Sequence, residues 1–352
     1  MKKSSLVFFM VLCTLLVTAQ QKPVVKAKQT KASDSTQHSS AGKIFGVIIS
    51  DLNYLLQEPQ AAPNQNKGTG GDNSFDIRRL HLGYEHTFSK ELSARVIYDP
   101  AVDSLQEAYL LWKNVFSMHS LTIGMMHTLA EKTSEKYFEY RSLGQLVMDK
   151  KGFSQEFDRG ISLTGNFDPQ GSVYYSFMVG NGSGMSPELN KVKKFYFTFG
   201  LMPDKGSVAE LYLDYENFTF GRSAITAKFL YAMMAKTYAF GLDGFYRMNR
   251  KFAGTKDIVP AGGSIFSWVE MMSSTRAVAR IDVIDDDLNN SGNNVASPSY
   301  REVYANVGLD YLPIPEVHLI PNIAYVMQMK KNKGPDIAEY MLARLTVAVY
   351  FK

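Results

Sequence analysis

From residue 43 onward, the chain alternates between apolar and polar positions with a period of two. In residues 275–284, for example, Ile281 and Val283 alternate with Arg280 and Asp282. Such a pattern predicts β-strands with one apolar face and one polar face. By this criterion we expect sixteen strands, near residues 43–56, 75–88, 90–99, 105–113, 119–128, 159–167, 172–180, 193–201, 208–216, 222–233, 237–247, 263–272, 275–284, 301–311, 316–328 and 339–351.

The length of these strands favours a membrane-spanning sheet. Many of the segments have ten to thirteen residues, whereas strands of ordinary sheets have about five or six. A tilted strand crosses a bilayer with about nine to eleven residues. Tyr, Phe and Trp flank the apolar faces, as they do in the aromatic girdles of outer-membrane barrels. No stretch reaches the roughly 18 consecutive apolar residues that predict a transmembrane helix.

The lengths of the connections give independent support. Those after even-numbered strands are short, and those after odd-numbered strands are mostly long; the exceptions follow the third and ninth strands. Outer-membrane barrels have an even number of strands, short periplasmic turns and longer outer loops. The mean hydropathy of −0.16 agrees, because lumen-facing residues are polar. We therefore predict an all-β fold, a transmembrane antiparallel β-barrel of about sixteen strands over residues 43–352.

The N-terminus has the features of an export signal. Lys2 and Lys3 precede an apolar run over 6–17, and Val17-Thr18-Ala19 offers a cleavage site before Gln20. Residues 1–19 are therefore expected to be a signal peptide; the alternative is a retained helical anchor. Residues 20–42 are rich in Lys, Ser, Thr and Gln without apolar periodicity, which predicts a flexible periplasmic tether. A basic arm that binds anionic lipid is the other interpretation of this stretch.

Composition excludes several classes of protein. The 352 residues carry 38 basic and 34 acidic side chains, a net charge of +4, with no basic patch interleaved with aromatics; nucleic acid is therefore not an expected partner. The only cysteine, Cys13, lies within the predicted signal, so the mature chain has neither a disulfide framework nor a cysteine metal site.

Three segments resemble a known family. They are FDIRRLHLGYEHTFSKELSARVIYD (75–99), DRGISLTGNF (158–167) and VGLDYLPIPEVHLIPNIAYV (307–326). In order and spacing they resemble the phosphate-selective porin O and P family and related Bacteroidetes-type porins. The last strand ends in the aromatic Phe351, which resembles the signal that barrel-assembly machinery reads, although Lys352 follows it.

The resemblance implies a porin in the outer membrane of a Gram-negative bacterium, surrounded by lipid and often a homotrimer. In such porins the loop after the fifth strand folds into the lumen, and here that loop is 129–158. It holds charges of both signs, which would set a transverse field across a constriction. From strand parity and from this loop, we expect the pore-lining or constriction residues to be Arg79, Arg95, Glu85, Glu107, Lys132, Glu135, Lys136, Arg141, Arg276, Arg280, Asp282 and Arg344.

One weak cation site is present in the sequence. Residues 287–292 match the first half of a calcium-binding loop, but Pro298 stands where the bidentate glutamate belongs. The candidate ligands are Asp285, Asp287, Asn289 and Ser291. The alternative is a polar surface loop, and no other cofactor is expected. Helix-spaced metal-binding histidines, a nucleophile elbow and a P-loop are all lacking from the sequence, so an enzyme is not expected.

These observations predict a porin that allows passive diffusion of ions and small polar solutes through a water-filled barrel. Acidic residues are interspersed among the inward-facing basic ones, which argues against phosphate specificity. One alternative is a substrate-specific channel, for phosphate or another anion, with lumen aromatics such as Tyr109, Tyr174 and Tyr196. The other is a non-pore β-rich surface binding protein.

Overall fold

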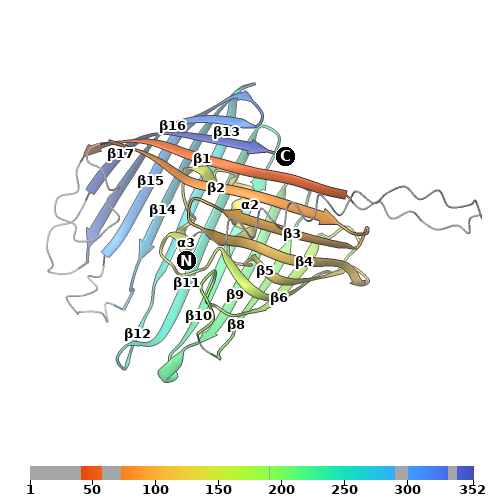
Figure 1. The fold of residues 1–352 in the computed structure, drawn as a ribbon. Coiled ribbons are helices and arrows are strands. Elements are labelled where there is room, and N and C mark those ends of the chain that lie inside the picture. Colours follow the sequence, from red (N-terminus) through yellow and green to blue (C-terminus); the bar gives the residue numbers. More distant parts are fainter. Residues whose placement is uncertain (1–40, 58–72, 190, 290–299, 332–338) are drawn as a thin grey trace, which may run out of the picture. The chain divides into compact units, whose positions relative to one another are not determined.

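The computed structural model describes residues 41–57, 73–189, 191–289, 300–331 and 339–352 (Figure 1). The expected signal peptide and nearly all of the expected tether lie outside these ranges. The strands are β1 (Ala41–Gln57), β2 (Asn73–Thr87), β3 (Leu92–Asp99), β4 (Ser104–Phe116), β5 (His119–His127), β6 (Phe157–Asn166), β7 (Val173–Gly180), β8 (Lys194–Leu201), β9 (Ser207–Asn217), β10 (Ser223–Met234), β11 (Tyr238–Ala253), β12 (Lys256–Ile258), β13 (Ala261–Met272), β14 (Thr275–Asp285), β15 (Tyr300–Ile314), β16 (Val317–Lys330) and β17 (Glu339–Phe351).

The strands form one closed antiparallel barrel. Each long strand pairs with its neighbours in the chain, and β1 pairs with both β2 and β17, which closes the sheet. The short β12 pairs only with the end of β11, and β13 takes the next place in the barrel. The expected barrel of sixteen strands is thus confirmed. The expected long loop over 248–262 is wrong in part, because β11 continues to Ala253 and forms a hairpin with β12.

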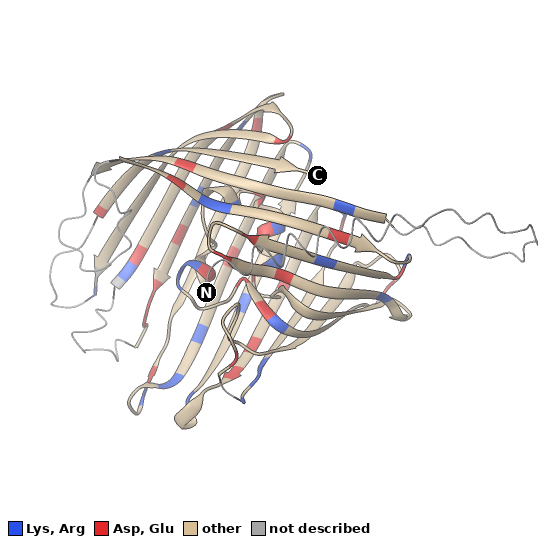
Figure 2. Cartoon of the chain, in the orientation of Figure 1, with Lys and Arg blue, Asp and Glu red and all other residues tan. Residues whose placement is uncertain are grey.

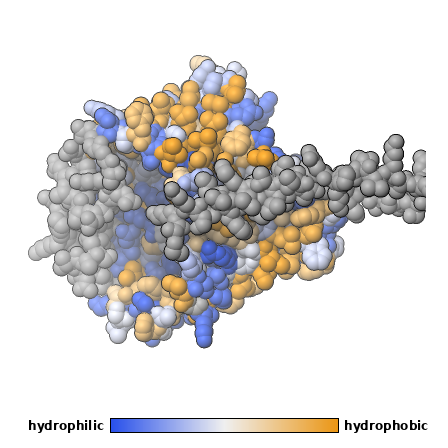
Figure 3. Space-filling view, in the orientation of Figure 1, coloured by the Kyte–Doolittle hydropathy of each residue, from blue (hydrophilic) through white to orange (hydrophobic). Residues whose placement is uncertain are grey.

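The outer wall of the barrel is apolar. Along β9, β10 and β14, Leu211, Ile225 and Ile281 are each about half exposed, and Figure 3 shows apolar side chains gathered over the strands. The inward neighbours of these residues are polar or covered. An apolar surface of this extent needs a non-aqueous environment. None of the helices in the described ranges is long and apolar enough to span a bilayer.

A β-bulge in β2 changes the expected facing of one residue. In the backbone pairing, Arg79 lies opposite Ile49 and Ile77 opposite Ser50, so no residue of β1 lies opposite Arg78. Strict alternation would point Arg78 toward lipid, but the extra residue turns it inward beside Arg79. Two guanidinium groups therefore face the lumen from adjacent positions.

The first and last strands are also joined by side chains. Asp51 on β1 accepts a hydrogen bond of 2.7 Å from the hydroxyl of Thr346 on β17. The same carboxylate accepts two bonds, of 2.7 and 3.0 Å, from Arg78 on β2. Asp51 is buried, so this network links three strands at the seam where the barrel closes.

Candidate channel constriction

Residues 128–156, which we call the constriction segment, connect β5 to β6 through the inside of the barrel (Figure 1). They form α2 (Lys132–Phe138), the 3-10 turn η1 (Arg141–Leu143) and α3 (Val147–Lys150). The expected inward loop, 129–158, corresponds to this segment. All three elements are short, so contacts with the wall must hold them in place.

One face of the segment packs on an apolar part of the inner wall. Phe138 is fully buried, with its ring centroid 5.1 Å from that of Phe266 on β13. Tyr137 and Leu143 belong to the same cluster, which includes Leu230 of β10. Apolar side chains would be poorly placed on a wall that faces water. The segment covers them, so that part of the lumen is filled.

Lys228 of β10 anchors the start of the segment. Its ammonium donates to the carbonyl oxygen of Ala130 at 2.5 Å and to the hydroxyl of Ser134 at 2.7 Å. It also lies 3.0 Å from Asp243 and 3.5 Å from Glu131. These side chains are almost completely buried, which makes the anchor a desolvated polar site.

The tip of the segment is held at the barrel seam. Arg78 donates to the carbonyl oxygen of Ser142 at 2.5 Å, and Arg344 of β17 donates to that of Leu143 at 3.2 Å. The hydroxyl of Tyr140 donates to Asp310 of β15 at 2.8 Å. The segment is therefore attached to wall strands on opposite sides of the lumen.

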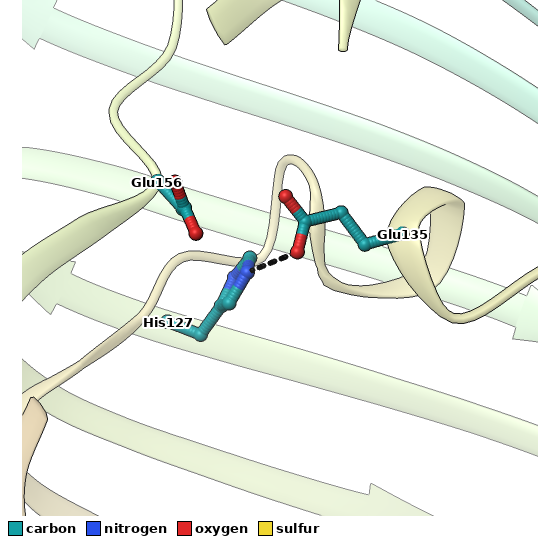
Figure 4. Close-up of side chains that lie close together, drawn as sticks. All are labelled: His127, Glu135 and Glu156. Atoms are coloured by element: carbon teal, nitrogen blue, oxygen red, sulfur yellow. Dashed lines mark hydrogen bonds and ion pairs between the residues drawn. The ribbon is translucent and has the colours of Figure 1, made fainter. Parts of the chain in front are cut away.

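A cluster of charged side chains joins the two ends of the constriction segment: His127, Glu135, Arg141 and Glu156. Figure 4 shows His127, Glu135 and Glu156. His127 Nε2 lies 3.1 Å from Glu135 Oε2, and its Nδ1 lies 3.1 Å from the carbonyl oxygen of Thr128. Arg141 donates to Glu135 at 2.8 Å and to Glu156 at 2.8 Å. Because both ring nitrogens of His127 face acceptors, the contacts are all satisfied when the imidazole is a cation.

This charged cluster has the spacing of a metal site but the charge balance of an ion-pair network. One ligand atom each from His127, Glu135 and Glu156 lie within 4.8 Å of one another. Arg79 and Arg141 already neutralise the carboxylates, and Arg79 lies 2.9 Å from Glu156. Burial alone raises the pKa of Glu135, but the hydrogen bond from His127 and the nearby positive charges outweigh it and lower that pKa to about 2.

The remaining expected pore residues lie on the inner wall, mostly in ion pairs. Arg95 pairs with Glu107 at 2.7 Å and with Glu85 at 3.3 Å, while Arg280 and Asp282 are 2.6 Å apart on β14. Arg276 lies 3.9 Å from Glu139 of the segment, with its guanidinium 4.3 Å above the ring of Trp268. Figure 2 shows basic and acidic residues distributed over the strands.

The acidic side chains of the constriction segment all have a basic partner, whereas two lysines do not. Glu131, Glu135, Glu139, Asp149 and Glu156 each lie within 4.0 Å of a lysine or arginine. Lys132 and Lys136 are exposed and form no ion pair with any described residue. The expected transverse field requires free acids as well as free bases on the segment; the structure leaves chiefly the two lysines.

The candidate calcium ligands are occupied by donors from the protein. Lys331 contacts Asp285 and donates to the carbonyl oxygen of Asp287 at 2.9 Å. Asp287 also accepts hydrogen bonds from the backbone N–H groups of Val259 and Asn289. Ser291 lies outside the described residues, so the calcium site stays a prediction.

The aromatic residues considered for a substrate site serve to pack the segment. Tyr196 is buried and donates to Asp158 at 2.7 Å. Tyr174 donates to Glu210 at 2.5 Å, and Tyr109 packs against a buried cluster that includes Met148. Tyr196 is thus shielded from the lumen, whereas Tyr109 and Tyr174 are partly buried.

From the sequence, we assumed strict alternation of inward and outward side chains along each strand. This assumption missed two residues that position the constriction segment. Arg78 was missed because of the bulge. Lys228 was missed because β10 is apolar at most positions, so its inward face is hard to recognise from the sequence. The apolar run over 229–234 is itself a usable signal, since it indicates a strand covered on both faces.

Comparison with known proteins identifies solved structures that share this fold. No protein-family model matches the chain, and no curated protein does. Among solved structures, an anion-selective porin from Comamonas acidovorans has a TM-score of 0.66 at 9% identity, covering 89% of this chain and 100% of its own. OmpT of Vibrio cholerae has a TM-score of 0.65 at 11% identity, covering 89% of this chain and 98% of its own. The channel DcaP of Acinetobacter baumannii has 0.64 at 12%, covering 91% of this chain and 100% of its own. The chain therefore has the fold of Gram-negative outer-membrane porins.

Proposed function

We propose that the protein is an outer-membrane porin through which ions and small polar solutes diffuse passively. The supporting observation is the combination of an apolar outer wall with a polar, charged inner wall that is narrowed by the constriction segment. The wall provides a stable place in lipid, and the charged lumen favours water and hydrated solutes. Export by residues 1–19, insertion by barrel-assembly machinery and a homotrimeric state belong to the same proposal.

The acidic side chains of the constriction segment have basic partners, whereas two of its lysines have no acidic partner among the described residues, and this imbalance gives the channel a preference for anions. On the constriction segment, Lys132 and Lys136 are the exposed cations, spaced by one helical turn of α2. The other face of α2 is buried through Ser134, Tyr137 and Phe138, so the lysines face the lumen. Unpaired charge at a narrow point selects ions of the opposite sign.

Reversing these two charges should reverse the ion preference. We expect the wild-type channel to show an anion-side reversal potential in a planar bilayer under a potassium chloride gradient. The double variant Lys132→Glu/Lys136→Glu should shift it to the cation side, because the free charge on the segment changes sign.

A matched control distinguishes the effect of these two positions from the effect of the change in net charge. Lys90→Glu/Lys236→Glu makes the same change in exposed turns between strands and should leave the reversal potential almost unchanged. If both double variants shift the potential equally, the segment is not the selecting element. A folded barrel that passes no current would instead contradict the porin itself and favour the binding-protein alternative.

Phosphate selectivity is the finer alternative. It predicts a conductance that saturates at low phosphate concentration, which requires a site where cations converge without acids. In the described lumen, Arg95 and Arg280 each pair with an inward-facing carboxylate on the wall. These pairs favour a general pore with a weak preference for anions.

A further inference from the structure

The anchor around Lys228 contains more negative than positive charge. Glu131 and Asp243 both face this single ammonium, and the side chains of the three residues are at most 3% exposed. Burying an unpaired charge is costly, because neither water nor a counter-ion compensates it. One carboxyl of the pair is therefore expected to be neutral.

The hydrogen bonds indicate which carboxyl that is. A lysine ammonium has three protons. The three closest acceptors around Lys228 are the Ala130 carbonyl, the Ser134 hydroxyl and Asp243, at 2.5, 2.7 and 3.0 Å. Asp243 gains a second donor from Ser134, at 2.8 Å. Glu131 lies farther from the ammonium, at 3.5 Å, and accepts from Ser154 at 2.7 Å.

Lys228 is the cation that acts most strongly on Glu131, and carboxylates lie on other sides of it. The groups facing it are Lys228 of β10, Asp243 of β11 and, along the segment itself, Glu135; Tyr212 of β9 lies on the same side. Glu210 of β9 adds another carboxylate close to Lys228. Burial, with help from the charge of Asp243, outweighs the attraction of Lys228 and raises the pKa of Glu131 to about 7.

We propose that the buried carboxyl of Glu131 is a proton-binding site and that its proton holds the constriction segment against the wall. With the proton bound, Asp243 is the one charged carboxylate in contact with the ammonium of Lys228. When the proton leaves, a second carboxylate faces the same ammonium without water. The start of α2, directly after Glu131, then detaches more easily.

The direction of the pH effect follows from linkage. A carboxyl whose pKa rises on folding binds its proton more tightly in the docked state. Its stabilising contribution is complete below its ordinary pKa of 4.5, falls as the pH rises, and is lost above about 7. The segment should thus be held most firmly in mildly acidic solution, and it should loosen on the alkaline side of neutrality.

The first test measures the proton directly and does not depend on conductance. Infrared difference spectra of the folded barrel in detergent should show the carbonyl stretch of a protonated carboxyl at pH 6 that disappears by pH 9. Glu131→Gln should lack this titrating band, whereas Glu139→Gln, at an exposed position of the same segment, should retain it. A wild-type spectrum without the band, or a band that persists in Glu131→Gln, would overturn the proposal.

The second test measures the consequence, which rests on the proposed function. Wild-type current in a planar bilayer should become larger and noisier between pH 6 and pH 9, whereas Glu131→Gln should stay at its low-pH level throughout. A pH response equal in both proteins would show that another group is responsible. If no variant conducts, the porin proposal fails, while the infrared result still decides whether Glu131 holds a proton.

A variant of Asp243, the other carboxyl at Lys228, keeps the proposal testable if Glu131→Gln does not fold. In Asp243→Asn, Glu131 becomes the only carboxylate of the described residues within 4.0 Å of Lys228. The proton should then leave at a lower pH, and the infrared band should be absent at pH 6. A band that titrates as in the wild type would mean that the two carboxyls do not share the ammonium, which would contradict the proposal.

Discussion

Replacing residues 132–151 with a short Gly-Ser linker should raise the single-channel conductance several-fold. These residues fill part of the lumen and cover the apolar stretch of inner wall around Phe266. Without them the narrowest cross-section becomes that of the barrel itself. The polar groups that they contact, including Lys228 and Glu302, would then be hydrated by lumen water. Single-channel recordings of the folded variant measure the change.

A point substitution provides a milder version of the same experiment. Phe138→Ala removes a fully buried ring and should weaken docking of the segment by about 3–5 kcal/mol. We expect larger and noisier currents, with the barrel still migrating as a folded, heat-modifiable species on gels. If both variants fold and conduct as the wild type does, the segment does not limit the pore.

Asp51→Leu should be the most damaging single substitution in the barrel wall. It removes the carboxylate that joins Thr346 to Arg78 across the seam and leaves the guanidinium of Arg78 without its counter-charge. Breaking a buried ion pair costs about 3–5 kcal/mol. The lower end applies here, because the side chain of Arg78 is 27% exposed. The temperature at which the folded gel band disappears should fall clearly.

Two companion variants identify the cause of that loss. Asp51→Leu/Arg78→Met removes the closer of the two cations that pair with Asp51 and should recover part of the stability. Arg344, 3.8 Å from Asp51, keeps its hydrogen bonds to Asn322 and Leu143. Glu316→Gln changes an exposed carboxylate in a turn and should have no effect. A double variant no more stable than Asp51→Leu would show that the ion pair is not what matters at this position.

The barrel was predictable because the same alternation of apolar and polar positions is repeated from strand to strand. Alternation such as that of Ile281 and Arg280 follows from a wall with lipid on one side and polar surroundings on the other. Long strands and alternating connection lengths then gave the number of strands and the closed topology. Each of these signals is local, so one sequence suffices to read them.

The constriction was predictable in position but not in detail. The length of residues 129–158, their place after the fifth strand and the resemblance to porins led us to expect an inward loop. Its attachments depend on contacts between distant residues, such as Lys228 with Ala130, which no local pattern reveals. The inward direction of Arg78 depends on a bulge. A single inserted residue reverses which side chains of a strand point inward, and strict alternation cannot foresee it.

The attachment of the segment tip also has a consequence for the order of assembly. Arg344 holds Leu143 although 201 positions separate them in the chain, and Thr346 reaches Asp51 across 295 positions. Contacts this distant in sequence form late, because the intervening chain must first be ordered. The tip therefore has its β17 anchor only after the last strand has paired. A barrel halted before that step would be unsealed at the seam, and the tip of the segment would lack its contact with Arg344.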